Sequence, residues 1–367
     1  MVPPPLTTDM ARRIRKTPGT RWLQRSFDTL ARSTLRAGTQ AVKQALRASP
    51  LLPKPKRRPR APAPSPQWTT GIAVGPGGSR HYRLYRPPGV RRDERRPLLV
   101  MLHGCNQDAA AFAASTRMNR IAARERFLVL YPEQDRLANA HGCWNWFETR
   151  SGRAQAEAAV IEAAIERVVR SQPVDPQRIA IAGLSAGAGM AALLAARRPQ
   201  RFRAVAMHSG IGPGVAHSSA SALSAMHGRR TATAPAMAPL QTPPGTSAST
   251  ARLPASRARL PALLVIHGSA DRVVAPGNGV EAVQRWAARA GARATATRTV
   301  QRGARHAAEI TDHRAGGRVV ATLCEVQGLG HAWSGGAAGH PYSDPRGPDA
   351  SRMIWAFAAR AFAQAEA

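Results

Sequence analysis

The stretch RIAIAGLSAGAGMAALLAARRP, residues 178–199, carries the strongest structural signal in the chain. Its first part alternates isoleucine and alanine, which predicts a buried strand, and its second part is uncharged and alanine-rich, which predicts a helix. Between them stands Gly183-Leu184-Ser185-Ala186-Gly187, a G-x-S-x-G pentapeptide. We therefore expect Ser185 on a sharp turn from strand to helix, the geometry of a nucleophile elbow.

A membrane-spanning helix is the competing interpretation of this stretch. Residues 179–196 carry no charge and are nearly long enough to cross a bilayer, and Gly183 and Gly187 have the spacing of a helix-dimer motif. Ser185 and the glycines interrupt the run, however, and it opens with β-branched residues. A strand, a turn and a helix in series explain it better.

Strand and helix patterns alternate on both sides of this turn. Such alternation predicts an α/β fold with a mostly parallel, doubly wound sheet and helices on both faces. An antiparallel pair, TTGIAV and RHYRLYRP, precedes it. The other predicted strands are PLLVMLHG, FLVLYPE, FRAVAMHSG, LPALLVIHG and GRVVATLCEVQG, and the predicted helices are residues 109–126, 154–172, 277–291 and 349–364.

Two regions depart from this alternation. Residues 1–67 combine a basic amphipathic helix over about 21–48, interrupted at Gly38, with a Pro- and Arg-rich segment that predicts a mobile linker. The catalytic body is expected over 68–367, with a low-complexity insertion at about 213–259 that is rich in Ala, Ser, Thr, Pro and Gly. We expect this insertion to be mostly mobile, with a functional lid as the alternative.

Charge and cysteine content bound the partners and the compartment. The 367 residues include 53 Lys plus Arg and 21 Asp plus Glu, a formal net charge of +32, which suggests polyanion binding or a general bias toward arginine. The three cysteines have no zinc-knuckle spacing, so no metal site is expected. The start MVPPPLTTDMARRIRK lacks the features of a signal peptide, which favours a cytoplasmic chain or export by an unseen route.

A serine hydroxyl needs a base, and with a nucleophile elbow the acid and then the histidine follow in the chain. Asp271 follows the predicted strand LPALLVIHG, and His331 follows the strand after it, in GLGHAWSGG. We expect both on loops at the edge of the sheet where Ser185 lies. A turn aspartate and an ordinary loop histidine are the alternatives. His340 is the main rival base, whereas His306 and His313 are expected in a polar connection before that strand.

Acyl transfer also needs an oxyanion hole and a substrate surface. We expect the amides of Ala186 and Cys105 as donors, Cys105 because it lies just after the strand PLLVMLHG. A Cys105–Cys143 disulfide would hold that loop, and two free thiols are the alternative. Trp144, Trp146 and Trp333 are expected in loops on the same rim, either stacking on substrate or packing there.

Together these segments resemble the polyhydroxybutyrate depolymerase family of esterases, relatives of feruloyl and acetylxylan esterases in the α/β-hydrolase superfamily. The resemblance implies Ser185, Asp271 and His331 as catalytic triad, Cys105 at the oxyanion loop, and an extracellular location. The matching segments cover about residues 80–365: LLVMLHGCNQDAAAFA, FLVLYPEQ, CWNWF, VDPQRIAIAGLSAGAGMAALLAARRP, FRAVAMHSG, HGSADRVVAPGNG, GLGHAWSGG and SDPRGPDAS.

The leading hypothesis is a cofactor-free serine esterase that cleaves a hydroxyalkanoate polymer or its oligomers. The alternative substrate is a feruloyl or acetyl ester on plant polysaccharide. A different class is a binding protein with an inactive hydrolase body, in which the basic N-terminal helix contacts a polymer granule or an anionic surface. A nucleic-acid partner is not favoured. In a cytoplasmic chain, the same helix would place the enzyme on a granule.

Overall fold

The computed structural model describes residues 65–229 and 259–366, with side chains up to Gln364. The chain divides into a unit Met1–Pro62 and a unit Ala63–Ala367. The amphipathic helix expected over residues 21–48 lies outside the described residues. Within the described residues, no helix is both long and apolar enough to cross a bilayer.

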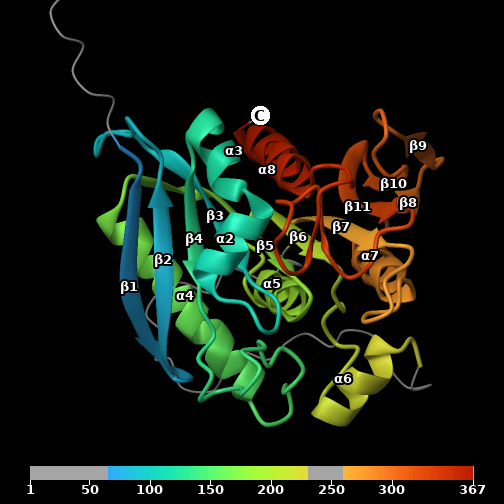
Figure 1. The fold of residues 1–367 in the computed structure, drawn as a ribbon, viewed down its shortest axis with the longest axis horizontal. Coiled ribbons are helices and arrows are strands. Elements are labelled where there is room, and N and C mark those ends of the chain that lie inside the picture. The colour runs from blue at the N-terminus through green and yellow to red at the C-terminus, as the bar shows by residue number, and fades with distance from the viewer. Residues whose placement is uncertain (1–64, 230–258, 367) are drawn as a thin grey trace, which may run out of the picture. The chain divides into compact units, whose positions relative to one another are not determined.

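An eleven-stranded sheet forms the centre of the larger unit (Figure 1). Its order is β1-β2-β4-β3-β5-β6-β7-β11-β10-β8, with β9 paired to β10. The neighbouring strands β4, β3, β5, β6, β7 and β11 run parallel to one another, whereas the β1–β2 hairpin and β10 are antiparallel to their neighbours. The strands are β1 Gln67–Gly75, β2 Gly78–Arg86, β3 Arg96–Leu102, β4 Leu128–Pro132, β5 Val174–Leu184, β6 Ala204–His208, β7 Ala262–Gly268, β8 Arg293–Ala294, β9 Arg298–Val300, β10 Ala308–Ala315 and β11 Arg318–Val326. A separate parallel pair joins β12 Trp333–Ser334 to β13 Ser343–Asp344.

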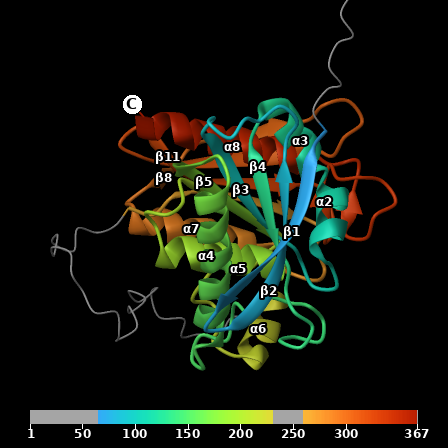
Figure 2. The same ribbon diagram turned by 90° about the vertical axis from the view of Figure 1, so that its left-hand side faces the viewer.

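Helices cover both faces of the sheet, as the strand–helix alternation predicts (Figure 2). On one face lie α4, α5 and α7, and on the other lie α2, α3 and α8. The helices are α2 Ala109–Thr116, α3 Met118–Glu125, α4 Arg153–Ser171, α5 Ala186–Arg197, α6 Ser219–Met226, α7 Gly277–Arg289 and α8 Ala350–Glu366.

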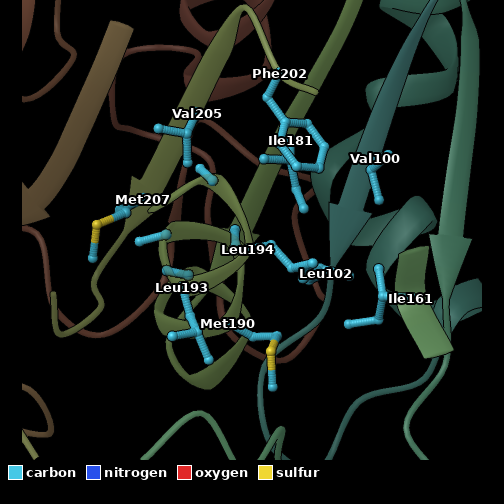
Figure 3. Packing of buried hydrophobic residues seen from close by; sticks show 14 of the residues in the cluster. Val100, Leu102, Ile161, Ile181, Met190, Leu193, Leu194, Phe202, Val205 and Met207 are labelled. Carbon is cyan, nitrogen blue, oxygen red and sulfur yellow. The ribbon is translucent and has the colours of Figure 1, made fainter. Parts of the chain in front are cut away.

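The central strands are buried on both sides, which is why they are apolar throughout. In β3, Leu98, Val100 and Leu102 belong to the core beneath α4 and α5, while Leu99 and Met101 belong to the core beneath α2 and α8. Figure 3 shows the first of these cores, with α5 packed against the middle of the sheet. This packing fixes the position of the turn between β5 and α5.

Three local features differ from the sequence prediction. The helix expected over residues 109–126 is two helices, because Arg117 adopts a left-handed conformation with φ 56° and ends α2 by donating to Ala113 O. The first part of the insertion expected at 213–259 contains α6, capped by Ser218, whereas residues 230–258 lie outside the described residues. The polar connection expected to hold His306 and His313 includes β10, which pairs with β11 and extends the sheet.

Candidate active site

Ser185 occupies the turn between β5 and α5 in a strained conformation, with φ 56° and ψ −118°. Non-glycine residues seldom adopt positive φ, and such strain persists only where surrounding structure enforces it. Here the Ser185 amide donates to His208 O at 2.9 Å, and its carbonyl accepts from Ala188 N at 3.0 Å and Gly189 N at 3.1 Å. The hydroxyl is thereby raised at the C-terminal edge of the parallel strands.

The two glycines of the pentapeptide are required by close backbone contacts. A Cβ on Gly183 would lie 2.3 Å from the carbonyl carbon of Gly187, and a Cβ on Gly187 would lie 2.2 Å from Leu102 O. Neither backbone neighbour can move aside cheaply. The glycines of G-x-S-x-G therefore let strand, turn and helix approach one another closely enough to hold Ser185.

Asp271 and His331 lie on the loops after β7 and β11, and the structure brings them together. His331 Nδ1 donates to Asp271 Oδ2 at 2.8 Å, and the two side chains are 10% and 0% exposed. The rival His340 is exposed, and His306 faces Asp344 instead of Asp271. Within the described part of the chain, Ser185 Oγ and His331 Nε2 are not joined by a hydrogen bond, so the serine is placed on the same edge but not yet engaged with the imidazole.

The Asp271 carboxylate is held at both oxygens. Its Oδ1 accepts from the amides of Val273 at 3.0 Å and Val274 at 2.9 Å, while Oδ2 faces His331 and, at 3.4 Å, Nε2 of His267. Burial alone would raise the pKa of Asp271, but the hydrogen bonds from His267, His331 and the backbone outweigh it and hold the pKa well below its usual range. Asp271 is therefore ionised and fixed in orientation.

His208, at the end of β6, links the serine turn to the loop that carries His331. Its carbonyl accepts from Ser185 N, and its ring Nε2 accepts from Ser334 N at 3.0 Å. Burial, with added repulsion from His267 and His331, lowers the pKa of His208 to about 3. The ring therefore stays neutral and keeps the lone pair that the Ser334 amide requires. The sequence analysis missed His208, although a lone polar residue in an apolar strand was a usable signal.

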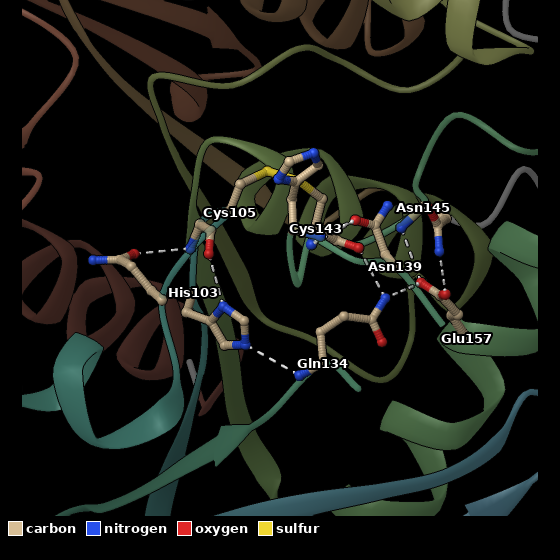
Figure 4. Close-up of a disulfide and its surroundings, with 10 residues drawn as sticks. His103, Cys105, Gln134, Asn139, Cys143, Asn145 and Glu157 are labelled. Atoms are coloured by element: carbon tan, nitrogen blue, oxygen red, sulfur yellow. Dashed lines mark hydrogen bonds between the residues drawn. A yellow bond between two sulfur atoms is a disulfide. The ribbon is translucent and has the colours of Figure 1, made fainter. Parts of the chain in front are cut away.

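The loop after β3 is organised around a disulfide between Cys105 and Cys143, whose Cα atoms are 4.3 Å apart (Figure 4). The Gly104 amide is taken by Gln107 Oε1 at 3.0 Å, and its carbonyl accepts from His103 Nδ1 at 2.8 Å. The amide of Cys105 has no acceptor among the described residues. It remains available as a donor next to the turn at Ala186.

Behind this disulfide lies a buried polar network that the sequence analysis missed (Figure 4). Glu157 on α4 accepts from Asn145 Nδ2 at 2.6 Å and from Gln134 Nε2 at 2.9 Å. Arg80 on β2 donates to Gln134 Oε1 at 2.6 Å and lies 3.6 Å from Glu157. Gln134 also donates to Cys143 O at 2.9 Å. The network ties the disulfide to the sheet and to α4.

The three tryptophans predicted as rim residues are buried, which favours packing over stacking on substrate, the two alternatives that the sequence left open. Trp144 and Trp333 are 0% exposed and Trp146 is 6% exposed. Trp146 packs over Gly189 of α5, where a Cβ would lie 2.8 Å from the ring, and Trp333 stacks on His208. These side chains turn inward because moving the apolar surface of an indole from water into the core is favourable.

The described residues contain no cluster of three or more His, Cys, Asp or Glu side chains placed to share a metal ion. The chemistry that this arrangement can perform is that of a buried acid–imidazole pair beside a strained serine, with two backbone amides close by. Such an arrangement suits acyl transfer through the serine oxygen.

Comparison with known proteins agrees with this geometry. The sequence profile of a family described as esterase PHB depolymerase matches residues 80–313. Poly(3-hydroxyalkanoate) depolymerase C of Paucimonas lemoignei is 33% identical over 59% of this chain and 50% of its own length. Feruloyl esterase B of Neurospora crassa is 28% identical over 52% of this chain and 63% of its own length. A probable acetylxylan esterase A of Aspergillus clavatus is 26% identical over 74% of this chain and 83% of its own.

The chain thus spans only about half to two thirds of the first two relatives. Among solved structures, an acetyl xylan esterase from Aspergillus awamori superposes with a TM-score of 0.58 and 19% identity, over 80% of this chain and 99% of that one. A fungal esterase from Rhizomucor miehei gives 0.50 and 16% over 82% and 86%. These likenesses show that the fold is that of the α/β-hydrolase esterases.

Proposed function

The chain belongs to the PHB depolymerase family of esterases, and from this premise we propose that it is a carboxylic ester hydrolase with Ser185 as nucleophile, His331 as base and Asp271 as orienting acid. The observation that carries the proposal is the buried 2.8 Å contact between His331 and Asp271 at the sheet edge where Ser185 stands. A buried acid–imidazole pair can also be purely structural, and the strained Ser185 with φ 56° is what favours the catalytic interpretation here.

The mechanism follows from which ring nitrogen of His331 is already hydrogen-bonded. Because His331 Nδ1 donates to Asp271, Nε2 is left to accept the hydroxyl proton when Ser185 turns toward it. The serine oxygen then attacks the ester carbonyl carbon, and the Cys105 and Ala186 amides stabilise the oxyanion. His331 returns the proton to the departing alcohol, and an activated water releases the acid from Ser185 by the same steps in reverse order.

For the substrate we propose a poly(3-hydroxyalkanoate) or its oligomers. Support comes from the family profile and from the relative named as a poly(3-hydroxyalkanoate) depolymerase, at 33% identity. Esters of plant polysaccharide are the alternative, supported by the relatives named as feruloyl and acetylxylan esterases. The buried tryptophans give neither substrate an exposed indole surface.

For location we propose the extracellular space. The Cys105–Cys143 disulfide supports this, because such bonds persist mainly in oxidising compartments. A granule-associated cytoplasmic enzyme is the alternative. We also propose that residues 1–67 bind the polymer or an anionic surface; their deletion should weaken adsorption to polymer particles while leaving turnover of a soluble ester unchanged.

A substrate panel with the full chain and its Ser185→Ala variant tests the proposal. We expect release of acid from 3-hydroxybutyrate oligomers and from a chromogenic short-chain ester, with the variant lower by about 10⁴-fold or more. Feruloyl esters and acetylated xylan are the comparison substrates. Activity on those alone would reassign the substrate. Equal activity of variant and parent would refute the serine mechanism, and no activity on any ester would favour the binding-protein alternative.

A further inference from the structure

A second histidine, His267, contacts the carboxylate proposed as the catalytic acid. It is the penultimate residue of β7, its side chain is 1% exposed, and its Nε2 lies 3.4 Å from Asp271 Oδ2. The same Nε2 lies 2.9 Å from Val274 O. The imidazole therefore faces two acceptors of the turn that follows its own strand.

The surroundings of the other ring nitrogen decide which one carries the proton. His267 Nδ1 is buried and has no hydrogen-bond partner among the described residues. It packs against the first turn of α7, where a Cβ on Gly279 would lie only 2.8 Å from it. A proton on Nδ1 would be buried without an acceptor, whereas a proton on Nε2 meets Val274 O and Asp271 Oδ2. The ring is therefore a donor toward the turn.

The hydrogen bond from His267 closes the turn from Asp271 to Val274. Val274 N donates to Asp271 Oδ1, and Val274 O accepts from His267, so the residue is tied on both sides. Asp271 Oδ2 stands between two imidazoles of different rigidity. His331 lies on a loop and is partly accessible, whereas His267 belongs to a central parallel strand. Only the second can serve as a fixed reference for the carboxylate.

We propose that His267 is a positioning residue, which holds the turn from Asp271 to Val274 and orients the Asp271 carboxylate toward His331. The proposal rests on the proposed function, since it assigns a role within the same site. His267 touches neither the serine nor, in the mechanism above, the substrate. Its effect passes through Asp271 to the imidazole of His331. Among the described residues, His208 also interacts electrostatically with His267, His331 and Asp271 from the end of β6.

The test compares His267→Leu with His267→Gln in the full chain. Leucine removes the donor, whereas the glutamine amide nitrogen can reach the position of Nε2 and donate there. For the leucine variant we expect kcat on a soluble ester to fall tenfold or more, with KM within twofold of the parent. The acid limb of the kcat/KM profile should move to lower pH, because a displaced carboxylate stabilises the His331 imidazolium less. The glutamine variant should recover most of the parental kcat and most of the parental pH profile.

A matched control is His306→Leu, since His306 Nε2 also lies 3.4 Å from a carboxylate, that of Asp344. This variant should keep parental kcat and an unchanged profile. If the leucine variant does not fold, His267→Asn takes its place, because its amide is too short to reach Val274 O. Proton NMR gives a readout besides turnover: the low-field resonance of the His331–Asp271 hydrogen bond should weaken in the leucine or asparagine variant and persist with glutamine.

The outcomes distinguish the positioning role of His267 from the proposed serine mechanism on which it rests. Parental kinetics in the leucine variant, or equal defects with leucine and glutamine, would overturn the positioning role. Ser185→Ala is assayed alongside. An inactive Ser185→Ala with a parental His267→Leu overturns the role of His267 alone, while an active Ser185→Ala overturns the serine mechanism itself.

Discussion

The serine turn and the loop after β3, which carries Cys105, meet at one edge of the sheet but are held in place by different forces. The turn at Ser185 is held by close backbone packing: Gly183 approaches Gly187 within the turn, and Gly187 approaches Leu102 O of β3 too closely for any side chain. The loop at Cys105 is held by groups far away in the chain: Cys143 is 38 residues off, and Arg80 reaches Gln134 across 54. One region is shaped by steric exclusion and the other by buried polar contacts.

The largest effect is expected from Gly187→Ala, which tests whether close backbone packing holds the serine turn. The new Cβ would lie 2.2 Å from Leu102 O, so β3 or α5 must shift, and we expect a loss of about 4 kcal/mol in the free energy of unfolding. Urea unfolding measures it. The control is Gly277→Ala in the first turn of α7, where a Cβ meets nothing within 4 Å and the change should stay within about 0.5 kcal/mol. Equal stabilities of the two variants would contradict the packing argument.

Glu157→Gln tests whether the buried polar contacts hold the loop at Cys105. Removing the charge leaves the buried Arg80 without its anion and turns an amide NH₂ toward the donors of Gln134 and Asn145, so we expect a loss of about 3 kcal/mol. Glu162→Gln is the matched control on the same helix, because its pair with Arg198 is partly exposed, at 23% and 60% for the two side chains, and is worth about 0.5 kcal/mol. A loss no larger than that of the control would mean that the network does not hold the loop.

Cys143→Ser removes the covalent link and keeps the Cys105 amide. Opening a bridge across 38 residues should lower the free energy of unfolding by about 2–3 kcal/mol. It should also lower kcat by about tenfold, as the oxyanion donor becomes less well placed. Reductant should reproduce both changes in the parent and leave the variant unaffected. A variant with parental kcat would show that Arg80, Gln134 and Glu157 suffice to place the loop.

The last expected effect is on the pH dependence of stability and concerns His208, which joins the serine turn to the His331 loop. Its pKa is about 3 in the folded chain against an ordinary 6.5, so the unfolded chain binds an extra proton between these values. Stability from the neutral ring is thus complete above about pH 6.5 and is lost as pH falls toward 3. In His208→Gln, the slope of unfolding free energy between pH 6 and 4 should flatten by about 1.4 kcal/mol per pH unit. An unchanged slope in urea titrations would refute this assignment.

Much of the fold was predictable because its signals are local. The apolar strands buried on both faces, the helices between them and the glycine-framed serine each appear within a dozen or so residues. The break at Arg117 and the strand β10 were not, because a left-handed turn and an edge pairing depend on partners elsewhere. The pairing of His331 with Asp271 was predicted from chain order, from their positions after two predicted strands and from the family resemblance, and its role in catalysis stays a prediction.

The sequence by itself determined that a serine stands on a strained strand-to-helix turn, since only glycines at 183 and 187 permit the close backbone approach. Tertiary structure alone decided the rest of the site. It turned three tryptophans inward, set His267 and His208 around the acid–base pair, and closed a polar network behind the disulfide. The contact of Gly183 with Gly187 lies within the pentapeptide and can be recognised in a motif. Hydrogen bonds across 30 residues or more exist only once the sheet has brought their partners together.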